Sequence, residues 1–142
     1  MFDTDEMVAA ELGMPIPDIF AQLGEERFRE MESEVLQKLD GAKVAIIVTG
    51  GGIVLRSENV RRLRELGTVV WLRTNLETLR ERLSRRQNRP LLQTQNRAET
   101  IATLLKERTK FYEEAADFAV DTSGLSHAEV AQAIRNGLQI SR

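Results

Sequence analysis

The segment from Val44 to Gly52 places the strongest constraint on the fold of this chain. Five apolar residues and a threonine are followed there by three consecutive glycines. This order predicts a buried strand whose carboxyl end opens into a glycine turn. Ligands of open α/β sheets bind beyond the carboxyl ends of the strands, and glycine lets the backbone approach a ligand because no Cβ intervenes. The run therefore predicts an α/β fold with a binding site at Gly50, Gly51 and Gly52.

The rest of the sequence predicts alternating strands and helices after residue 40, which favours a parallel sheet. β-branched runs predict strands at Val44–Val48 and Thr68–Leu72, both buried on two faces, and a weaker strand at Phe118–Asp121. The expected helices in the second part are Ser57–Leu66 with Ser57 as N-cap, Thr74 to about Arg86, Arg97–Ala116 and one opened by Ser126. Thr74-x-x-Glu77 and Ser126-x-x-Glu129 both have the capping-box pattern. The first forty residues predict helices at Asp5–Leu12, Pro17–Leu23 and Glu25–Leu39, separated by glycines.

Composition limits the possible functions. The 142 residues predict one domain over residues 1–142. A net charge of −2 gives no case for nucleic acid or an anionic membrane as partner. Cysteine is absent, which excludes disulfides, thiolate metal sites and cysteine nucleophiles. The acidic N-terminus does not have the pattern of a signal peptide, and we expect a cytoplasmic protein.

Two groups in the N-terminal part carry candidate chemistry. Asp3 and Asp5 share a face of an extended segment, where they could hold Mg²⁺ through water and accept hydrogen bonds from a polyol. The alternative for this pair is a disordered terminus or a helix N-cap. Arg29 precedes Glu32 by three residues, so the carboxylate can hold the guanidinium for bidentate carboxylate recognition. The alternative is an ordinary surface ion pair.

The C-terminal part contributes a group of arginines that run into a polar loop. They could grip phosphates or stack on a base, or they form a solvated face. The group consists of Arg80, Arg82, Arg85, Arg86 and Arg89. Because Arg89 precedes the rigid Pro90, residues 87–96 are interpreted as a mobile lid loop. Arg108 lies four residues before Tyr112 on the long helix and is unremarkable by itself.

Taken in order, these segments resemble one family, the shikimate kinases, over nearly the whole chain. The similarity includes Phe2-Asp3-Thr4-Asp5, the stretches Gly13–Phe20 and Gly24–Glu32, and Thr49-Gly50-Gly51-Gly52. It continues through Asn88-Arg89-Pro90-Leu91-Leu92, Glu107-Arg108-x-x-Phe111-Tyr112 and Ala116-Asp117-x-x-Val120-Asp121-Thr122. The resemblance implies a P-loop-kinase-like α/β/α fold that transfers the γ-phosphate of ATP to the 3-hydroxyl of shikimate, in aromatic amino-acid biosynthesis.

The resemblance also implies a role for each candidate residue. Asp3 matches a carboxylate that helps to hold Mg²⁺, and Asp5 matches one that binds shikimate hydroxyls and assists deprotonation. Arg29 and Arg108 match arginines that grip the shikimate carboxylate, and Gly50, Gly51 and Gly52 match the glycines whose amides contact the substrate. Arg89 matches the lid arginine over phosphate and substrate, and Arg82 matches an arginine against adenine. Such roles suit phosphoryl transfer, in which positioning and charge stabilisation supply most of the catalysis.

The sequence departs from the family in one respect. It contains no G-x-x-x-x-G-K-[ST] motif, and the first strand–loop–helix unit of the family has no counterpart. The expected consequences are weak or absent ATP binding and self-association through unpaired strands. Three explanations compete: a true start further upstream, a truncated paralogue, or a chain completed by a second polypeptide. The alternative functions are a non-catalytic ligand-binding or regulatory module and another small-molecule kinase of gluconate type.

Overall fold

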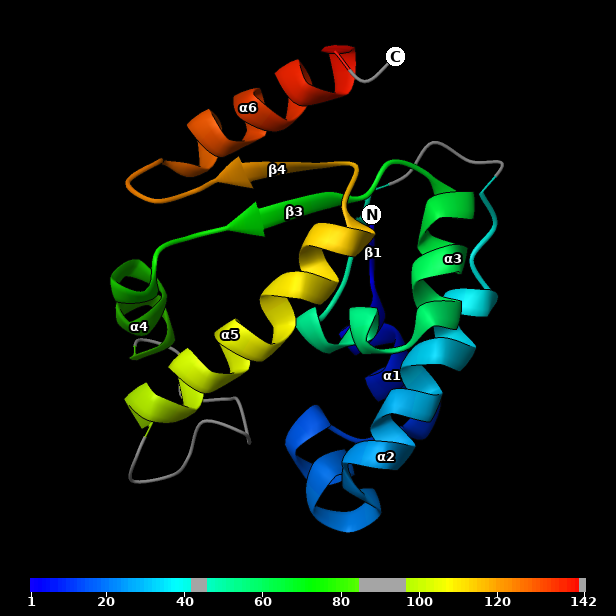
Figure 1. Ribbon diagram of the computed structural model, residues 1–142. Coiled ribbons are helices and arrows are strands. Elements are labelled where there is room, and N and C mark those ends of the chain that lie inside the picture. The colour runs from blue at the N-terminus through cyan, green and yellow to red at the C-terminus, as the bar shows by residue number, and fades with distance from the viewer. Residues whose placement is uncertain (42–45, 85–96, 141–142) are drawn as a thin grey trace. The chain divides into compact units, whose positions relative to one another are not determined.

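The computed structural model describes residues 1–41, 46–84 and 97–140, which belong to two compact units, Met1–Gly67 and Thr68–Arg142 (Figure 1). Each unit contains one pair of parallel strands with helices around it. The parallel α/β class predicted from the sequence is therefore confirmed. None of the helices in the described ranges combines the length and the hydropathy that crossing a membrane requires.

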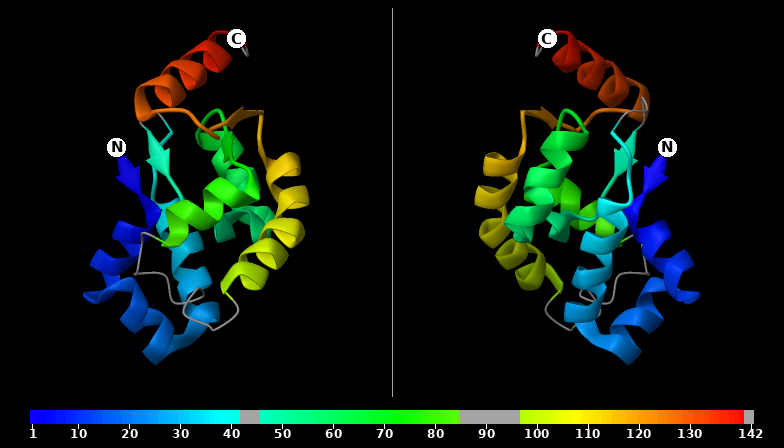
Figure 2. Two further views of the ribbon diagram at one scale, coloured as in Figure 1. Left: turned by 90° about the vertical axis from the view of Figure 1, so that its left-hand side faces the viewer. Right: turned by 90° about the vertical axis from the view of Figure 1, so that its right-hand side faces the viewer.

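The first unit, hereafter unit 1, begins with a strand that runs directly into a helix. Its elements are β1 Phe2–Asp3, α1 Thr4–Leu12, α2 Ile16–Gln37, β2 Ile47–Val48, the 3₁₀ helix η1 Gly51–Leu55, and α3 Ser57–Leu66. Strands β1 and β2 pair in parallel with Phe2 opposite Ile47 and Asp3 opposite Val48, and Figure 2 shows them side by side. This register brings the end of β1 beside the chain that enters the glycine turn.

Two glycines set the helix boundaries of unit 1 by taking up a left-handed backbone conformation. Gly13 ends α1 at φ 65°, and its N–H donates to the carbonyl of Ala9. Gly24 interrupts α2 with φ 82° and ψ 169°, so α2 consists of two helical parts joined by a kink at this residue. The two helices predicted on either side of Gly24 are therefore confirmed. A residue with a Cβ is disfavoured at both dihedral combinations, which explains glycine at both positions.

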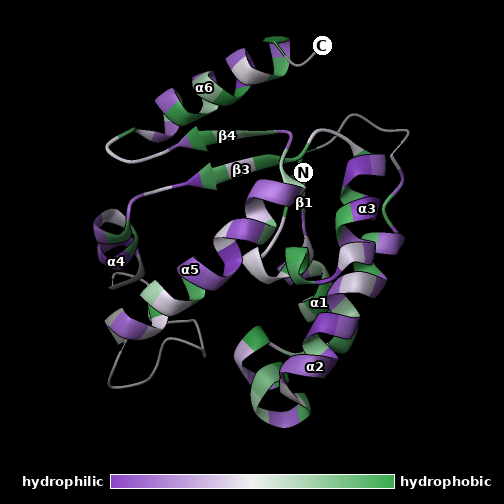
Figure 3. Ribbon diagram, viewed as in Figure 1, coloured by the Kyte–Doolittle hydropathy of each residue, from purple (hydrophilic) through white to green (hydrophobic). Residues whose placement is uncertain are grey.

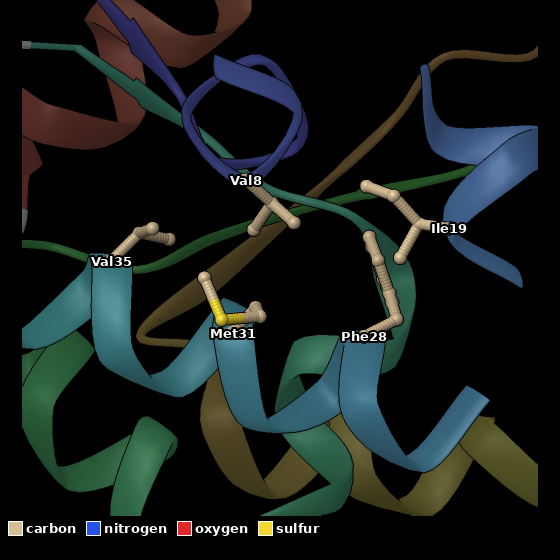
Figure 4. Packing of buried hydrophobic residues seen from close by; sticks show 5 residues of the cluster. All are labelled: Val8, Ile19, Phe28, Met31 and Val35. Atoms are coloured by element: carbon tan, nitrogen blue, oxygen red, sulfur yellow. The ribbon is translucent and has the colours of Figure 1, made fainter. Parts of the chain in front are cut away.

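The core of unit 1 lies between α1 and α2. Figure 4 shows five side chains that point toward one another, Val8 from α1 and Ile19, Phe28, Met31 and Val35 from α2. All five are at most 4% exposed. Across the kink, the rings of Phe20 and Phe28 lie 4.7 Å apart. Apolar residues at helical spacing on α2 thus form the face that fixes this helix, and with it the polar residues of the neighbouring turn.

The second unit, hereafter unit 2, is built around another parallel pair. Its elements are β3 Val70–Arg73, α4 Leu76–Ser84, α5 Arg97–Ala115, β4 Phe118–Asp121 and α6 His127–Ile140. The register pairs Val70 with Phe118 and Arg73 with Asp121, so both strands end at one edge. Figure 3 shows hydrophobic residues along both strands. The strand at Phe118–Asp121 and the long helix are confirmed, the helix ending one residue earlier than expected.

Three local predictions were wrong. Arg56, not Ser57, is the N-cap of α3, and its side chain makes no capping bond. Thr74 does not cap α4: the Asn75 Oδ1 accepts a 2.8 Å bond from the N–H of Thr78. The strands are not buried on both faces, since Val48 is 41% and Leu72 52% exposed. Each strand has one described partner in a two-stranded sheet, and these apolar side chains on the sheet faces remain partly open to solvent.

The second capping box was predicted correctly. The N–H and the hydroxyl of Ser126 donate to the Glu129 carboxylate at 2.8 and 2.7 Å, and the N–H of Glu129 donates to the Ser126 hydroxyl at 3.3 Å. Hydrogen bonds from the Ser126 side chain and backbone lower the pKa of Glu129, because they favour its ionised form. This reciprocal pair fixes the start of α6 in the way that the motif predicts.

Candidate functional site

The glycine turn follows β2 as predicted, and its backbone is held by hydrogen bonds and by the buried residues that follow it. Gly50 is extended, with φ −67° and ψ 150°, and its carbonyl accepts from the N–H of Ile53 at 3.3 Å. Ile53 and Val54 of η1 are buried, which anchors the turn in the core of unit 1. The buried Asn59 of α3 donates from Nδ2 to the carbonyl of Ile53 at 3.1 Å. The glycines are therefore held at the carboxyl end of β2, where α/β proteins place ligands.

Arg29 on α2 faces this turn within a buried ion pair. Its Nη1 donates to the Glu32 Oε2 at 2.7 Å, and its Nη2 donates to the Glu25 Oε1 at 3.1 Å. The Arg29 side chain is 11% exposed and that of Glu32 is 0% exposed. The alternative of a surface ion pair is therefore wrong for Arg29 and Glu32. Spacing of three residues puts both groups on one helix face, as the sequence predicts.

Burial and hydrogen bonding act in opposite directions on the Arg29 guanidinium. Burial lowers the pKa of Arg29, whereas hydrogen bonds and charge interactions with Glu32 and Glu25 raise it, and the net pKa is raised. The group stays cationic at every pH at which the protein is folded. The guanidinium also lies 5.3 Å from the centre of the Phe28 ring. Arg29 is thus a fixed, permanent positive charge beside the turn.

Two of the glycines leave room for these charged side chains. A Cβ built on Gly52 would overlap the guanidinium of Arg29. A Cβ on Gly50 would lie 3.2 Å from both the Asp5 Oδ1 and the Glu32 Oε1. Glycine is required here by close approach rather than by an unusual dihedral angle. We call Asp5, Arg29, Glu32, Gly50 and Gly52 the unit 1 cluster.

The two N-terminal aspartates have different surroundings. Asp3 is the N-cap of α1, and its Oδ1 accepts hydrogen bonds from the backbone N–H groups of Asp5 at 2.9 Å and Glu6 at 3.4 Å. The N-cap alternative for Asp3 is therefore confirmed. Asp5 is half-buried and belongs to the unit 1 cluster. Among the described residues, no group of three or more His, Cys, Asp or Glu side chains could hold a metal ion.

In unit 2 the carboxyl ends of β3 and β4 carry a second polar group. Arg82 of α4 donates from Nη1 to the Thr122 hydroxyl at 2.9 Å and from Nη2 to the Thr122 carbonyl at 2.8 Å. The hydroxyls of Thr74 and Ser123 lie 3.2 Å apart at the same edge. Arg82 is thus held at the ligand-binding edge of this sheet.

Of the remaining arginine candidates, some lie among the described residues and others do not. Arg108 lies half-buried on α5 of unit 2. Arg29 belongs to unit 1 and Arg108 to unit 2, and the two units are described separately. Arg85, Arg86, Arg89 and the lid loop at residues 87–96 lie outside the described residues.

Two residues that hold this framework are not among the candidates predicted from the sequence. Thr122 enters the sequence analysis only as the last residue of a stretch similar to the family, yet it anchors Arg82, which lies 40 residues away. Asn59 was not singled out, although it is 1% exposed and holds the glycine turn. A polar residue on the apolar face of a helix is a usable signal for Asn59. The carbonyl of Thr122 accepts a local bond from the N–H of Leu125 at 3.3 Å, but its bonds with Arg82 and Arg73 are long-range, so no local pattern signals them.

The fold matches solved structures closely. A shikimate kinase from Acinetobacter baumannii, solved in complex with shikimate, has a TM-score of 0.93 at 34% identity and covers 99% of this chain and 79% of its own. A shikimate kinase from Aquifex aeolicus has a TM-score of 0.80 at 34% identity, with coverage of 97% and 80%. Together with the parallel strands and the polar groups at their carboxyl ends, these matches define a P-loop-kinase-like α/β phosphotransferase.

The particular family follows from the sequence comparisons. The shikimate kinase family matches residues 1–139. A shikimate kinase from Thermodesulfovibrio yellowstonii is 45% identical over 132 residues, 93% of this chain and 76% of that protein. One from Moorella thermoacetica is 44% identical over 137 residues, with coverage of 96% and 78%. The chain belongs to the shikimate kinase family, whose members phosphorylate shikimate with ATP in aromatic amino-acid biosynthesis. The comparisons favour this activity over that of a gluconate-type kinase.

Proposed function

We propose that the unit 1 cluster is the shikimate site and that its residues have the roles that the family resemblance implies. The observation that carries this proposal is the convergence of Asp5, Arg29 and the glycine turn in one place. Arg29 would bind the shikimate carboxylate through charge-assisted hydrogen bonds, with Glu32 holding its orientation. The amides of Gly50, Gly51 and Gly52 would contact the ligand. By the family resemblance, Arg108 would also contribute to binding the shikimate carboxylate.

The proposed chemistry is transfer of the γ-phosphoryl group of ATP to the 3-hydroxyl of shikimate. The hydroxyl oxygen forms the new bond to phosphorus, the bond to the β-phosphate oxygen breaks, and ADP leaves. Asp5 would bind the hydroxyl and accept its proton. Arg89 would close over the transferring phosphate, and Arg82 would lie against adenine. Positioning and charge stabilisation supply most of the rate in such reactions. We propose a cytoplasmic location, where ATP is available.

The proposal includes a magnesium ion, which Asp3 would help to hold. Magnesium in phosphotransferases is bound by one or two carboxylates, waters and substrate phosphates rather than by a cage of protein ligands. A single carboxylate fits that manner of binding, and Asp3 lies two residues before Asp5, at the start of α1. When bound, Mg²⁺ would neutralise charge on the phosphates. Asp3 would hold it through water while its Oδ1 caps the helix.

The 142-residue polypeptide is expected to bind Mg-ATP very weakly and to show no appreciable turnover. It contains no G-x-x-x-x-G-K-[ST] motif, whose amides, lysine and hydroxyl stabilise the transferring phosphoryl group. Isothermal titration of the purified polypeptide with Mg-ATP measures this, and a coupled assay for ADP measures turnover. Micromolar ATP binding together with shikimate phosphorylation would contradict it. Absent turnover with intact shikimate binding would match the ligand-binding alternative as well.

Arg108→Ala is expected to weaken shikimate binding by about 2–4 kcal/mol, because a carboxylate contact of the charge-assisted kind is lost. Lys110→Ala is the matched control on the same helix, since Lys110 is 81% exposed and pairs with the neighbouring Glu114. Isothermal titration with shikimate compares both variants with the unmodified polypeptide. Equal affinities of the two variants would remove Arg108 from the proposed site and leave the unit 1 cluster unaffected.

A further inference from the structure

The two bonds between Arg82 and Thr122 form a fork at the edge of the unit 2 sheet. Both terminal nitrogens of the guanidinium donate to one residue, Nη1 to the hydroxyl at 2.9 Å and Nη2 to the carbonyl at 2.8 Å. Two such bonds fix the plane of the group as well as its position. Arg82 itself is exposed on α4, and Figure 1 shows α4 following β3 beyond the end of that strand.

Thr122 is itself immobilised by the strand pair. It is 5% exposed, and its hydroxyl donates to the carbonyl of Arg73 at 3.1 Å while accepting from Arg82. Its backbone N–H donates to the same carbonyl at 2.8 Å. The Thr122 hydroxyl thus links the end of β3 to the guanidinium of Arg82. The fork rests on the sheet rather than on a mobile surface side chain.

A guanidinium whose plane is fixed presents a flat, cationic face on which a planar ring can stack. Stacking of a base on such a face tolerates different bases, because every base has a π-face. Fixing the side chain before binding also removes the entropy cost of ordering it. We propose that Thr122 is a positioning residue that holds the Arg82 plane as a stacking platform for the nucleobase. The proposal rests on the nucleotide role of Arg82 proposed above and adds Thr122 as the residue on which that role depends.

The test is a ¹H–¹⁵N NMR titration of the 142-residue polypeptide with adenosine and, separately, with guanosine. Nucleosides carry no phosphate, so the readout does not require a phosphate cradle. The unmodified polypeptide should show shifts at residues 122–125 with both nucleosides. Thr122→Val, which keeps the volume but removes the hydroxyl, should weaken both affinities about three- to tenfold, as expected for one hydrogen bond. Thr122→Ser should restore them.

Two controls separate positioning from a structural role. Thr109→Val removes another hydroxyl of unit 2, one that donates to the carbonyl of Leu105 in its own helix, and should leave both affinities unchanged. In an Arg82→Ala background, Thr122→Val should have no further effect, because Thr122 acts through Arg82. Additive losses in that double variant would overturn the proposal. A loss confined to adenosine would overturn stacking.

Failure of this inference is distinguishable from failure of the proposed function. Equal nucleoside affinity of Thr122→Val and the unmodified polypeptide overturns the role of Thr122 and leaves Arg82 in place. No nucleoside shifts at residues 122–125 overturn both the inference and the adenine role of Arg82. The shikimate site is read separately, from shifts at Gly50, Gly51 and Gly52 on addition of shikimate.

Discussion

Replacing Arg29 by alanine should lower the free energy of unfolding by about 3 kcal/mol and remove measurable shikimate binding. The Glu32 carboxylate is 0% exposed and accepts the 2.7 Å bond from Arg29. Removing one member of a buried ion pair leaves the other charge in a low dielectric, which typically costs about 3–5 kcal/mol. Urea unfolding measures the stability, and isothermal titration with shikimate measures the binding.

Arg27→Ala is the matched control for this experiment. Arg27 lies on the same helix and also pairs with two glutamates, Glu30 and Glu34, but its side chain is 43% exposed. Exposed ion pairs contribute little, so both stability and shikimate affinity should stay within about 0.5 kcal/mol of the unmodified polypeptide. Similar losses of stability in Arg27→Ala and Arg29→Ala would show that burial of the Arg29–Glu32 pair adds no stability. Tight shikimate binding by Arg29→Ala would refute its role as the carboxylate ligand.

Gly52→Ala should weaken shikimate binding about thirtyfold, or roughly 2 kcal/mol, with a smaller effect on stability. The added methyl group would occupy the place of the Arg29 guanidinium. A long side chain can move away from such an overlap, but here it would have to leave its bonds with Glu32 and Glu25. The position of the charge therefore changes more than the packing of the core does. Parallel isothermal titrations and urea unfolding separate the two effects.

Gly67→Ala serves as the control for this substitution. A Cβ at Gly67 has no atom within 4 Å, and its φ of 160° is extended backbone that alanine adopts. Shikimate affinity should be unchanged. In an Arg29→Ala background, where shikimate binding is no longer measurable, the free energy of unfolding is the readout, and Gly52→Ala should change it little because the group that it displaces is gone. Full additivity of the two substitutions in the free energy of unfolding would show that Gly52 acts independently of Arg29.

Local signals made much of unit 1 predictable. Gly13 and Gly24 interrupt the helices where the sequence indicates, because their positive φ angles suit glycine. The Arg29–Glu32 pair follows from a spacing of three residues, but its burial does not, since burial depends on how α2 packs against the turn. Whether strands were covered on both faces was likewise beyond local prediction. Val48 and Leu72 are apolar and yet exposed, because burial of a sheet face depends on what packs against it and not on the sequence of the strand.

In unit 2, long-range contacts decide more of the structure than local sequence signals do. Ser126 and Glu129 form the capping box that their spacing predicts, whereas Thr74 and Glu77, with the same spacing, do not. Thr74 is instead engaged with Ser123 across 49 positions of sequence. A contact between residues so far apart in the sequence can replace the one that a local motif predicts, and the motif does not reveal it. The anchoring of Arg82 by Thr122 has the same long-range origin.

The surroundings of Arg29 have an electrostatic consequence for ligand choice. One guanidinium stands there against three carboxyl groups, those of Glu25, Glu32 and Asp5. The formal charge of this group of side chains is therefore negative, and alone it would repel an anion at long range. At the proposed site, a carboxylate ligand would therefore gain its attraction from direct contact with Arg29. The proposed site would then favour an anion that also carries hydroxyls, since carboxylate groups accept hydrogen bonds that a simple anion cannot donate.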